Sequence, residues 1–313
     1  MSSAAYPILR VESDQVVGDE QLGTKTKFWF EQNKVRWLFK EAREINDPRG
    51  VVSTGEDWAE KIAAEVARVL KIPAAVVELA EFEGRRGCAS CIFTSPSQQL
   101  MHGNEVLAGH VAGYDRAKRF RQSSHTLENI IMAIREMFFA EAANRTVLTR
   151  LASYLVLDAL IGNVDRHHEN WGLLWQVRVE PDDFRETAKL FKEYDVAPSF
   201  DHASALGREL LDEKRSKLLQ SKAVESYVFK GRGGIFYRQG DAHGANPLRL
   251  VLLASRKYPA YFMPVLQVLQ SVPRERLTET LDRVPNERIT LHARVFGKEM
   301  ISVAYEYLTR VVK

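Results

Sequence analysis

The sequence predicts an α+β fold with two unequal lobes, and three observations support this prediction. Short runs that alternate between apolar and polar residues, as strands do, occur in residues 21–40 and 74–93, on either side of one helix-like segment. From about residue 125 the apolar residues recur at helical spacing instead. No internal repeat or low-complexity tract divides the chain. We therefore expect one unit, with a small strand-rich N-lobe over residues 1–107 and a larger, mostly helical C-lobe over residues 108–313.

The composition is that of an ordinary soluble protein. Of the 313 residues, 45% are hydrophobic and 27% are charged, and the formal net charge is +3. This small charge gives no indication of binding to nucleic acid or to an anionic membrane. No apolar run approaches the roughly 18 residues that a membrane helix needs, and the first residues lack the regions of a signal peptide. We therefore expect a cytoplasmic protein that contacts neither a membrane nor nucleic acid directly.

The first strands are predicted from an aromatic run. Residues 1–20 are polar and weakly patterned. Residues 21–30 lead from a glycine-containing turn into an aromatic strand, and residues 35–40 alternate as a second strand that ends on a lysine. A polar loop is expected over residues 44–55.

A helix follows this loop. Ser53 and Thr54 are both suitable N-cap residues, and an apolar stripe at helical spacing continues until Pro73 ends the helix. Residues 74–80 and 87–93 then predict two more strands. The predicted order is strand, strand, helix, strand, strand.

The second half of the chain is predicted to be mostly helical. Two helices are expected first, and Gly162 ends the second of them. The predicted elements are helices over residues 125–143 and 147–159, a strand over 171–179, a charged excursion over 180–195 and further helices over 203–313.

The two cysteines, Cys88 and Cys91, have the spacing of a redox pair or of half a zinc site. No second cysteine pair exists to complete such a zinc site. Residues 87–93 alternate like a strand, in which residues three apart point to opposite faces. We therefore interpret both as buried structural thiols, with a functional pair as the alternative.

The most informative stretch follows the second predicted helix and reads GNVDRHHENWG over residues 162–172. It places Asp165 five residues before Asn170, and a further carboxylate, Asp201, follows in the stretch APSFD. Carboxylate and amide oxygens in small number suit magnesium, which keeps waters and phosphate oxygens as its other ligands. A polar helix-capping loop with chance carboxylates is the alternative interpretation.

These two stretches resemble the catalytic region of the HipA-like kinases, in which Gly-Asn-x-Asp-x-His-x-x-Asn precedes Ala-Pro-x-x-Asp. Phosphoinositide kinases carry a similar Asp-Arg-His-x-x-Asn loop, so the stretch indicates the chemistry better than the acceptor. The resemblance implies a two-lobed protein-kinase-like fold that uses ATP and Mg²⁺. In such a fold Asp165 takes the proton of the attacking hydroxyl, Asn170 and Asp201 hold magnesium, and His167 organises the loop.

The resemblance also implies a lysine that contacts the nucleotide phosphates and a helix glutamate that orients it through an ion pair. Lys40, at the end of its predicted strand, matches the lysine, and Glu60, thirteen residues before Pro73, matches the glutamate. Glu65 is the rival. Because five residues rotate a helix by about 140°, only one of the two glutamates can face Lys40.

Further nucleotide contacts are predicted from place in the chain. HipA-like phosphate loops run Gly-x-x-x-Lys before a strand, and this pattern occurs seventeen residues before Lys40. The residues of this predicted loop are Gly23, Thr24, Lys25, Thr26 and Lys27. Asn104 and Glu105 lie between the lobes, where adenine contacts fall in a two-lobed kinase. The basic, glycine-rich run 230–234 is interpreted as a solvated loop, with approach to an acceptor as the alternative.

The two adjacent histidines leave a metal-dependent hydrolase as an alternative. His167 and His168, with Asp165 and Glu169, are side chains that a transition-metal hydrolase could use. Adjacent histidines usually diverge, and no distant histidine cluster is evident, so His168 is expected to pack locally or to point to solvent.

Three classes of function therefore compete. The favoured class is an ATP- and Mg²⁺-dependent serine/threonine protein kinase of HipA-like type, with a Ser or Thr of a protein as its acceptor. The resemblance implies a toxin of a toxin–antitoxin pair, held in check by a small DNA-binding antitoxin. A lipid or small-molecule kinase and a non-catalytic ATP-binding module are the alternatives.

Overall fold

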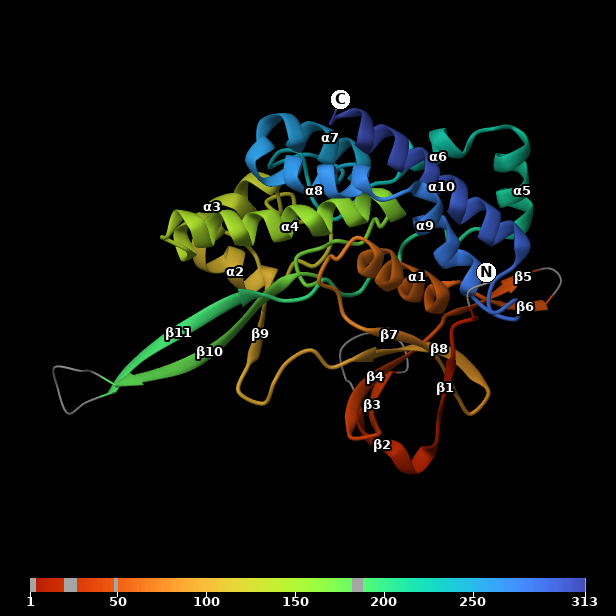
Figure 1. Cartoon of the computed structure of the whole chain (residues 1–313), viewed down its shortest axis with the longest axis horizontal. Coiled ribbons are helices and arrows are strands. Elements are labelled where there is room, and N and C mark those ends of the chain that lie inside the picture. Colours follow the sequence, from red (N-terminus) through yellow and green to blue (C-terminus); the bar gives the residue numbers. More distant parts are fainter. Residues whose placement is uncertain (1–3, 20–26, 48–49, 182–187, 313) are drawn as a thin grey trace.

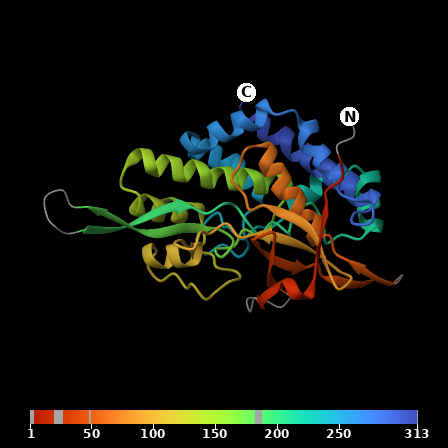
Figure 2. The same cartoon turned by 60° about the horizontal axis from the view of Figure 1, so that its bottom comes forward.

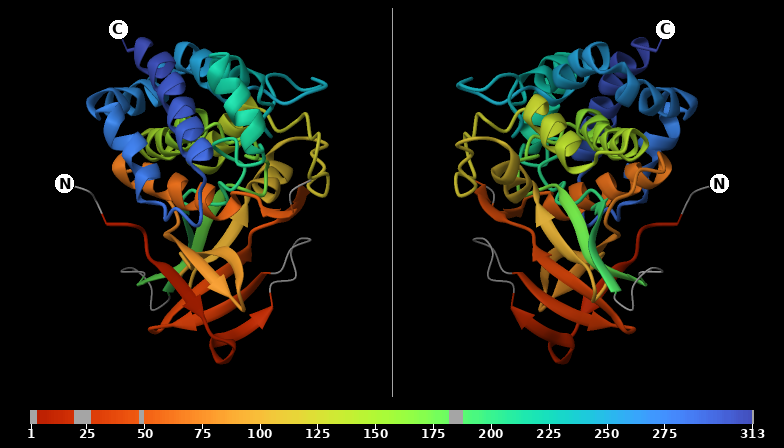
Figure 3. Two further views of the ribbon diagram at one scale, coloured as in Figure 1. Left: turned by 90° about the vertical axis from the view of Figure 1, so that its right-hand side faces the viewer. Right: turned by 90° about the vertical axis from the view of Figure 1, so that its left-hand side faces the viewer.

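The structure is a computed structural model that describes residues 4–19, 27–47, 50–181 and 188–312. A curled sheet lies on one side of the molecule and a group of helices on the other, and a long hairpin projects from their junction (Figure 1). Figure 3 shows the same two layers from both ends. The protein is thus of the predicted α+β class.

The sheet has six strands in the order β1-β7-β8-β4-β3-β2. Neighbouring strands are antiparallel, apart from the parallel pair β1 and β7. The strands predicted over residues 21–40 and 74–93 are confirmed with small shifts of their ends. The bounds are β1 (Ile8–Val11), β2 (Val16–Asp19), β3 (Lys27–Gln32), β4 (Val35–Glu41), β7 (Val77–Phe82) and β8 (Arg85–Cys91).

Aromatic residues fill the inner face of this sheet. Phe28, Phe30 and Phe39 come from alternate positions of β3 and β4 and are 4% exposed or less. The rings of Phe28 and Phe39 stack with their centroids 4.9 Å apart. Since alternate residues of a strand share a face, the alternation that predicted the strands is also what builds this small core.

Helix α1 (Glu56–Val69) packs against β7 and β8 and also contacts α4 of the helical part, as Figure 2 shows. Its apolar stripe, which includes Ile62 and Val66, belongs to one buried core that continues through the helices. The predicted N-caps are wrong by one or two residues, because Gly55 is the N-cap and the buried Thr54 hydroxyl makes no hydrogen bond.

The helical part surrounds the 21-residue helix α4, which is almost wholly buried from Val147 onward. The predicted helix over residues 125–143 is interrupted at residues 138–140, so that two helices occupy this region. The bounds are α2 (Gly103–His110), α3 (Leu127–Met137), α4 (Glu141–Ile161), α5 (Asp212–Gln220), α6 (Val224–Lys230), α7 (Pro247–Lys257), α8 (Pro259–Ser271), α9 (Arg274–Thr278) and α10 (Leu291–Arg310). No helix in the described part of the chain is long and apolar enough to cross a membrane.

The projecting hairpin consists of β10 (Gly172–Pro181) and β11 (Ala188–Val196), and β9 (Gln99–His102) pairs with the base of β10. The strand predicted over residues 171–179 is confirmed. In the described part of the charged excursion predicted over residues 180–195, residues 188–195 belong to strand β11. The charged residues described on β11 face solvent. A two-stranded ribbon need not bury one face, so its strands need not alternate between apolar and polar residues.

Two other segments contain strands that the pattern did not predict. Residues 1–20 include β1 and β2, and the predicted polar loop 44–55 includes the hairpin of β5 (Glu44–Asp47) and β6 (Gly50–Ser53). β1 pairs with β7, about seventy residues away in sequence, a contact that a local pattern cannot reveal. The division of the chain into lobes at residue 107 stays a prediction.

Both cysteines are free thiols. Cys88 is buried and stands opposite Lys40 in the register of β4 and β8, whereas Cys91 is half-buried at the strand end. Burial raises the pKa of both thiols, which keeps them protonated and unreactive at neutral pH. The interpretation as structural thiols therefore agrees with their surroundings.

Candidate active site

The Asp165 loop (residues 162–170) begins where α4 ends. Gly162 has a left-handed backbone, with a φ of 66°, and caps the helix as glycine readily does. The next residues turn back beneath the helix, and the amide of Asn163 donates to the Asp158 carbonyl over 2.9 Å. The apolar helix thus fixes one end of the loop in the core.

Arg166 holds the middle of the loop. Its Nε and Nη2 atoms donate to the two carboxylate oxygens of Asp158, over 2.7 and 2.8 Å, and both side chains are about 5% exposed or less. The same guanidinium donates to the carbonyl of Asn170 and to the hydroxyl of Ser199. One buried side chain therefore ties α4, the Asn170 end of the Asp165 loop and the stretch before Asp201 together.

Asn170 is positioned by the loop itself. Its side-chain amide donates to the carbonyl oxygen of Asp165 over 2.8 Å. The amide nitrogen is thus used within the loop, which leaves the side-chain oxygen for another ligand. Because this contact involves the Asp165 backbone, it leaves the Asp165 carboxylate free to act.

Asp201 and Lys40 meet although they are 161 residues apart in sequence. The Lys40 ammonium lies 3.2 Å from Oδ1 of Asp201. Asp201 has a left-handed backbone, with a φ of 58°, which is uncommon outside glycine. The Lys40 charge holds the pKa of Asp201 below its ordinary value. Burial would lower the pKa of Lys40, but the carboxylates of Asp201 and Glu60 raise it overall.

Glu60 faces the same site from α1. It is 2% exposed, and its Oε1 lies 3.5 Å from Nδ1 of His202, whose Nε2 contacts the Ser199 hydroxyl over 2.7 Å. Its other oxygen has no hydrogen-bond partner among the described residues. No ion pair joins Glu60 to Lys40 in this structure, so the predicted orienting contact is absent here, although Glu60 is close enough to affect the pKa of Lys40.

Glu65 points elsewhere. Its carboxylate binds Lys61 at 2.8 Å and Arg68 at 2.6 Å, and it also lies 3.7 Å from Arg283. The two glutamates thus occupy different faces of α1, as the helical period requires.

The two adjacent histidines diverge. Their ring planes are 84° apart, and each has its own partners. His167 accepts a hydrogen bond from the Glu169 amide and faces Arg119, whereas Nδ1 of His168 contacts the Tyr114 hydroxyl. His168 packs locally and is buried, so its expected alternative, a position in solvent, is wrong. In the described part of the chain no three His, Cys, Asp or Glu side chains gather as a cluster that could hold a metal ion.

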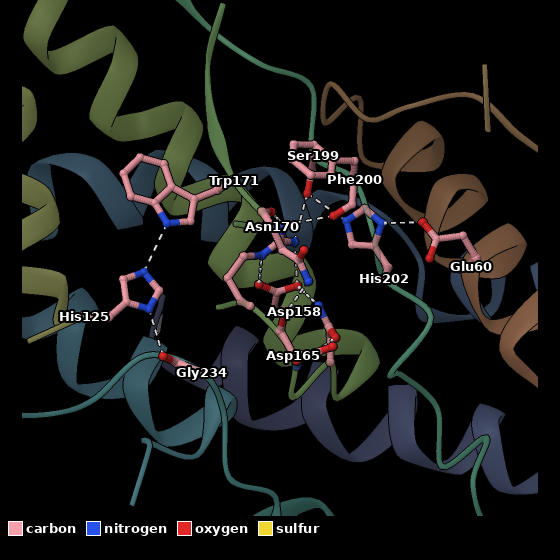
Figure 4. A network of polar contacts seen from close by, with 12 residues as sticks. Glu60, His125, Asp158, Asp165, Asn170, Trp171, Ser199, Phe200, His202 and Gly234 are labelled. Atoms are coloured by element: carbon pink, nitrogen blue, oxygen red, sulfur yellow. Dashed lines mark hydrogen bonds and ion pairs between the residues drawn. The ribbon is translucent and has the colours of Figure 1, made fainter. Parts of the chain in front are cut away.

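Several site residues escaped the sequence analysis. Trp171 donates to His125 over 3.1 Å, and His125 donates through Nδ1 to the Gly234 carbonyl over 2.8 Å, which Figure 4 shows. Burial lowers the pKa of His125 to about 3, so the ring stays neutral. Asp158 could have been found, because it is the one charged residue in the apolar run from residue 154 to residue 161. Ser199 and His202 stand beside Asp201 but carried no signal of their own.

The structure describes only some of the other predicted nucleotide contacts. Gly23, Thr24, Lys25 and Thr26 lie outside the described residues, whereas Lys27 is described at the start of β3 and its charge helps to lower the pKa of Asp201. At the start of α2, the Asn104 side chain donates to the Arg116 carbonyl and the Glu105 carboxylate accepts from the His102 amide. Both side chains thus have a local structural use, and their contact with adenine stays a prediction.

Burial and the nearby Asp201 charge raise the pKa of Asp165 to about 6. A carboxylate must be ionised to accept a proton, so a reaction that needs Asp165 as base should slow as the pH falls through about 6, not about 4. We expect this acidic limb, a fall in kcat/KM toward low pH, in a profile measured between pH 4.5 and 8. The residual activity of Asp165→Asn is the control, because a limb that persists there would belong to another ionising group.

Comparison with known proteins identifies a family and a fold. The model of the HipA-like C-terminal domain matches residues 22–230, more than half of the chain. No curated protein matches the sequence.

Among solved structures, the Helicobacter pylori proinflammatory kinase CtkA has a TM-score of 0.76 at 16% identity, over 98% of this chain and 99% of its own. HipA of Shewanella oneidensis MR-1, solved with HipB and operator DNA, has a TM-score of 0.51 at 11% identity, over 98% of this chain and 67% of its own. At these identities the similarity shows the fold, which is kinase-like. From the family match, the chain is a member of the HipA-like C-terminal domain family.

Proposed function

We propose that this protein is an ATP- and Mg²⁺-dependent kinase that phosphorylates Ser or Thr residues of a protein. The observation that carries the proposal is the meeting of Lys40 and Asp201 beside Asp165. Lys40 supplies a cation from the sheet, Asp201 a carboxylate of the type that binds metal, and Asp165 a carboxylate with a raised pKa. Phosphoryl transfer requires groups of these three kinds.

The residues present fit magnesium and a nucleotide. Asp201 and the side-chain oxygen of Asn170 are hard oxygen donors, and Glu60 keeps a buried oxygen that receives no hydrogen bond from the described residues. Asp201 and Asn170 would hold the metal, and the Lys40 ammonium beside Asp201 would bind the nucleotide phosphates. Bound Mg-ATP supplies the phosphoryl group and neutralises its charge.

The chain's own contribution to the reaction is the proton transfer. Asp165 accepts the proton of the acceptor hydroxyl at its carboxylate, and its raised pKa makes it a stronger base than an ordinary aspartate. Arg166 keeps the loop in place through Asp158, and His167 fixes the turn of the loop by accepting from the Glu169 amide. Positioning of this kind accounts for much of catalysis in phosphoryl transfer.

A test of the function uses γ-labelled ATP, magnesium and a bacterial lysate. We expect label on protein with the wild type and its loss with Lys40→Met, since that change removes the phosphate-binding charge. Lys40→Met should also lose most of the thermal stabilisation by Mg-ATP, whereas Glu65→Gln, on the other face of α1, should keep both. Label in the extracted metabolites or lipids would favour the small-molecule or lipid kinase, and no label with wild-type protein would refute the proposal.

A protein partner is part of the proposal. The HipA of Shewanella oneidensis is solved together with HipB and operator DNA. By analogy of family and fold, we propose that a small DNA-binding protein holds this kinase in check and that any contact with DNA passes through that partner.

A further inference from the structure

A cavity of about 320 Å³ lies beside Asp165. Neither Lys40 nor Asp201 lines it, so it differs from the nucleotide-binding groups proposed above. Three segments form its walls, namely residues 119–125, the Asp165 loop and residues 232–244. We call it the acceptor cavity.

The wall formed by residues 232–244 is held by backbone hydrogen bonds. In the run 230–234, interpreted above as a solvated loop, Lys230 and Arg232 are exposed, whereas Gly233 and Gly234 are half-buried. The amide of Gly233 donates to the Ala245 carbonyl over 2.7 Å, and the amide of Ala245 donates to the Ile235 carbonyl over 2.6 Å. A Cβ atom on Gly234 would lie 2.7 Å from the carbonyl oxygen of Arg166. Only glycine allows this close approach, so the wall rests on the backbone of the Asp165 loop.

The cavity carries positive charge that the protein leaves unmatched. Three arginines line it, and Arg119 is paired with Glu169 at 3.3 Å. Arg121 and Arg232 are exposed, and within residues 4–19, 27–47, 50–181 and 188–312 neither has a hydrogen bond or an ion pair. The only carboxylate in the lining is Asp165. Two guanidinium groups are therefore available to an anionic ligand.

A buried polar atom also lies in the cavity wall. His168 lines the cavity and is 1% exposed, and its Nε2 has no hydrogen-bond partner among the described residues. Buried polar atoms without partners are rare in folded proteins, because such atoms normally bond to protein groups, water or a bound molecule. This nitrogen is closed to solvent in the structure, so a ligand in the cavity would reach it only after the His168 ring had turned.

We propose that this cavity receives the acceptor segment of a protein substrate and that acidic side chains flank the Ser or Thr of that segment. The proposal rests on the proposed kinase function. With the hydroxyl at Asp165, neighbouring Asp or Glu residues would pair with Arg121 and Arg232. Guanidinium and carboxylate groups form strong two-point hydrogen bonds, which give selectivity as well as affinity.

The openness of the cavity favours a peptide over a metabolite. Sites for small molecules usually enclose most of their ligand, but Arg121, Arg232, Ala242 and His243 all line the cavity and are exposed. An open groove suits an extended chain. Nucleic acid is a poorer fit, because such binders neutralise several phosphates and only two free guanidinium groups are present here, among the residues that the structure describes.

The test uses degenerate Ser/Thr peptides whose flanking positions are Glu, Ala or Lys. We expect the wild type to prefer the Glu set over the Ala set by about tenfold in kcat/KM, as for one well-formed charge pair. The double variant Arg121→Glu/Arg232→Glu should lose or invert this preference. Arg256→Glu, which reverses the charge of one exposed arginine of α7 outside the cavity, should keep it.

Hydrolysis of ATP with water as acceptor separates this proposal from the kinase function. The double variant should retain this hydrolysis, since the nucleotide residues are untouched. Equal use of the three peptide sets by the wild type, or an unchanged preference in the double variant, would overturn the acidic acceptor while the kinase function stands. Label that passes to a phosphorylated metabolite or to RNA in place of peptide would overturn it as well. A wild type without any turnover of ATP would refute both.

Discussion

Replacement of Asp165 by asparagine should lower the rate of phosphoryl transfer by about a hundredfold to ten-thousandfold, the usual contribution of a positioned general base. Asparagine has the same shape but cannot accept the proton of the acceptor. The loop should keep its form, because Asn170 donates to the backbone carbonyl of Asp165 and not to its carboxylate. Binding of Mg-ATP should therefore persist.

Single-turnover transfer and calorimetric binding of the nucleotide measure these two quantities separately. Asp195→Asn is a suitable control, because this carboxylate is 62% exposed on β11 and pairs with Arg150 away from the site. A variant Asp165→Asn that transfers at the wild-type rate would show that another group is the base. Loss of nucleotide binding together with transfer would mean that the loop had changed its shape.

Replacement of Asp158 by asparagine should destabilise the fold by about 3–5 kcal/mol, the usual result of removing one partner from a buried ion pair. Both carboxylate oxygens accept hydrogen bonds from Arg166, and Oδ1 also accepts from the Asn163 side chain over 2.7 Å. The side-chain amide NH₂ of asparagine would face the N–H donors of Arg166 or Asn163. The buried guanidinium of Arg166 would also lose its counter-charge.

Urea unfolding and thermal scans compare this variant with Asp195→Asn. The control removes a similar charge from an ion pair of 2.6 Å that is largely in solvent, and it should change the stability by less than about 1 kcal/mol. If the two variants unfold alike, the contacts of Arg166 do not hold the site together, and other contacts must position Asn170 and Ser199.

The sequence was most informative where chemistry restricts the residue type within a short span. Asp165, Asn170 and Asp201 could be selected because the stretches that contain them resemble the catalytic region of the HipA-like kinases. The helical period separated Glu60 from Glu65, and the structure places them on different faces of α1.

What the sequence did not reveal depends on contacts between distant segments. His125 and Gly234 meet across 109 residues, and β1 pairs with β7 through a register that no local pattern sets. The partner of Lys40 was also unforeseen, since its ammonium lies on Asp201 and not on Glu60. Which carboxylate a buried lysine chooses is decided by competing charges in the folded site, and spacing in sequence does not contain that information.

The pairing of Lys40 with Asp201 also bears on the order in which ligands arrive. Asp201, the carboxylate that would bind the metal, is already paired with Lys40. A free divalent cation would therefore have to displace Lys40, and the ammonium would lose this anionic partner. When the metal arrives together with nucleotide phosphates, the displaced ammonium gains new anionic partners at once. On the proposed function, we therefore expect the site to take up magnesium and nucleotide as one complex and to bind free metal weakly.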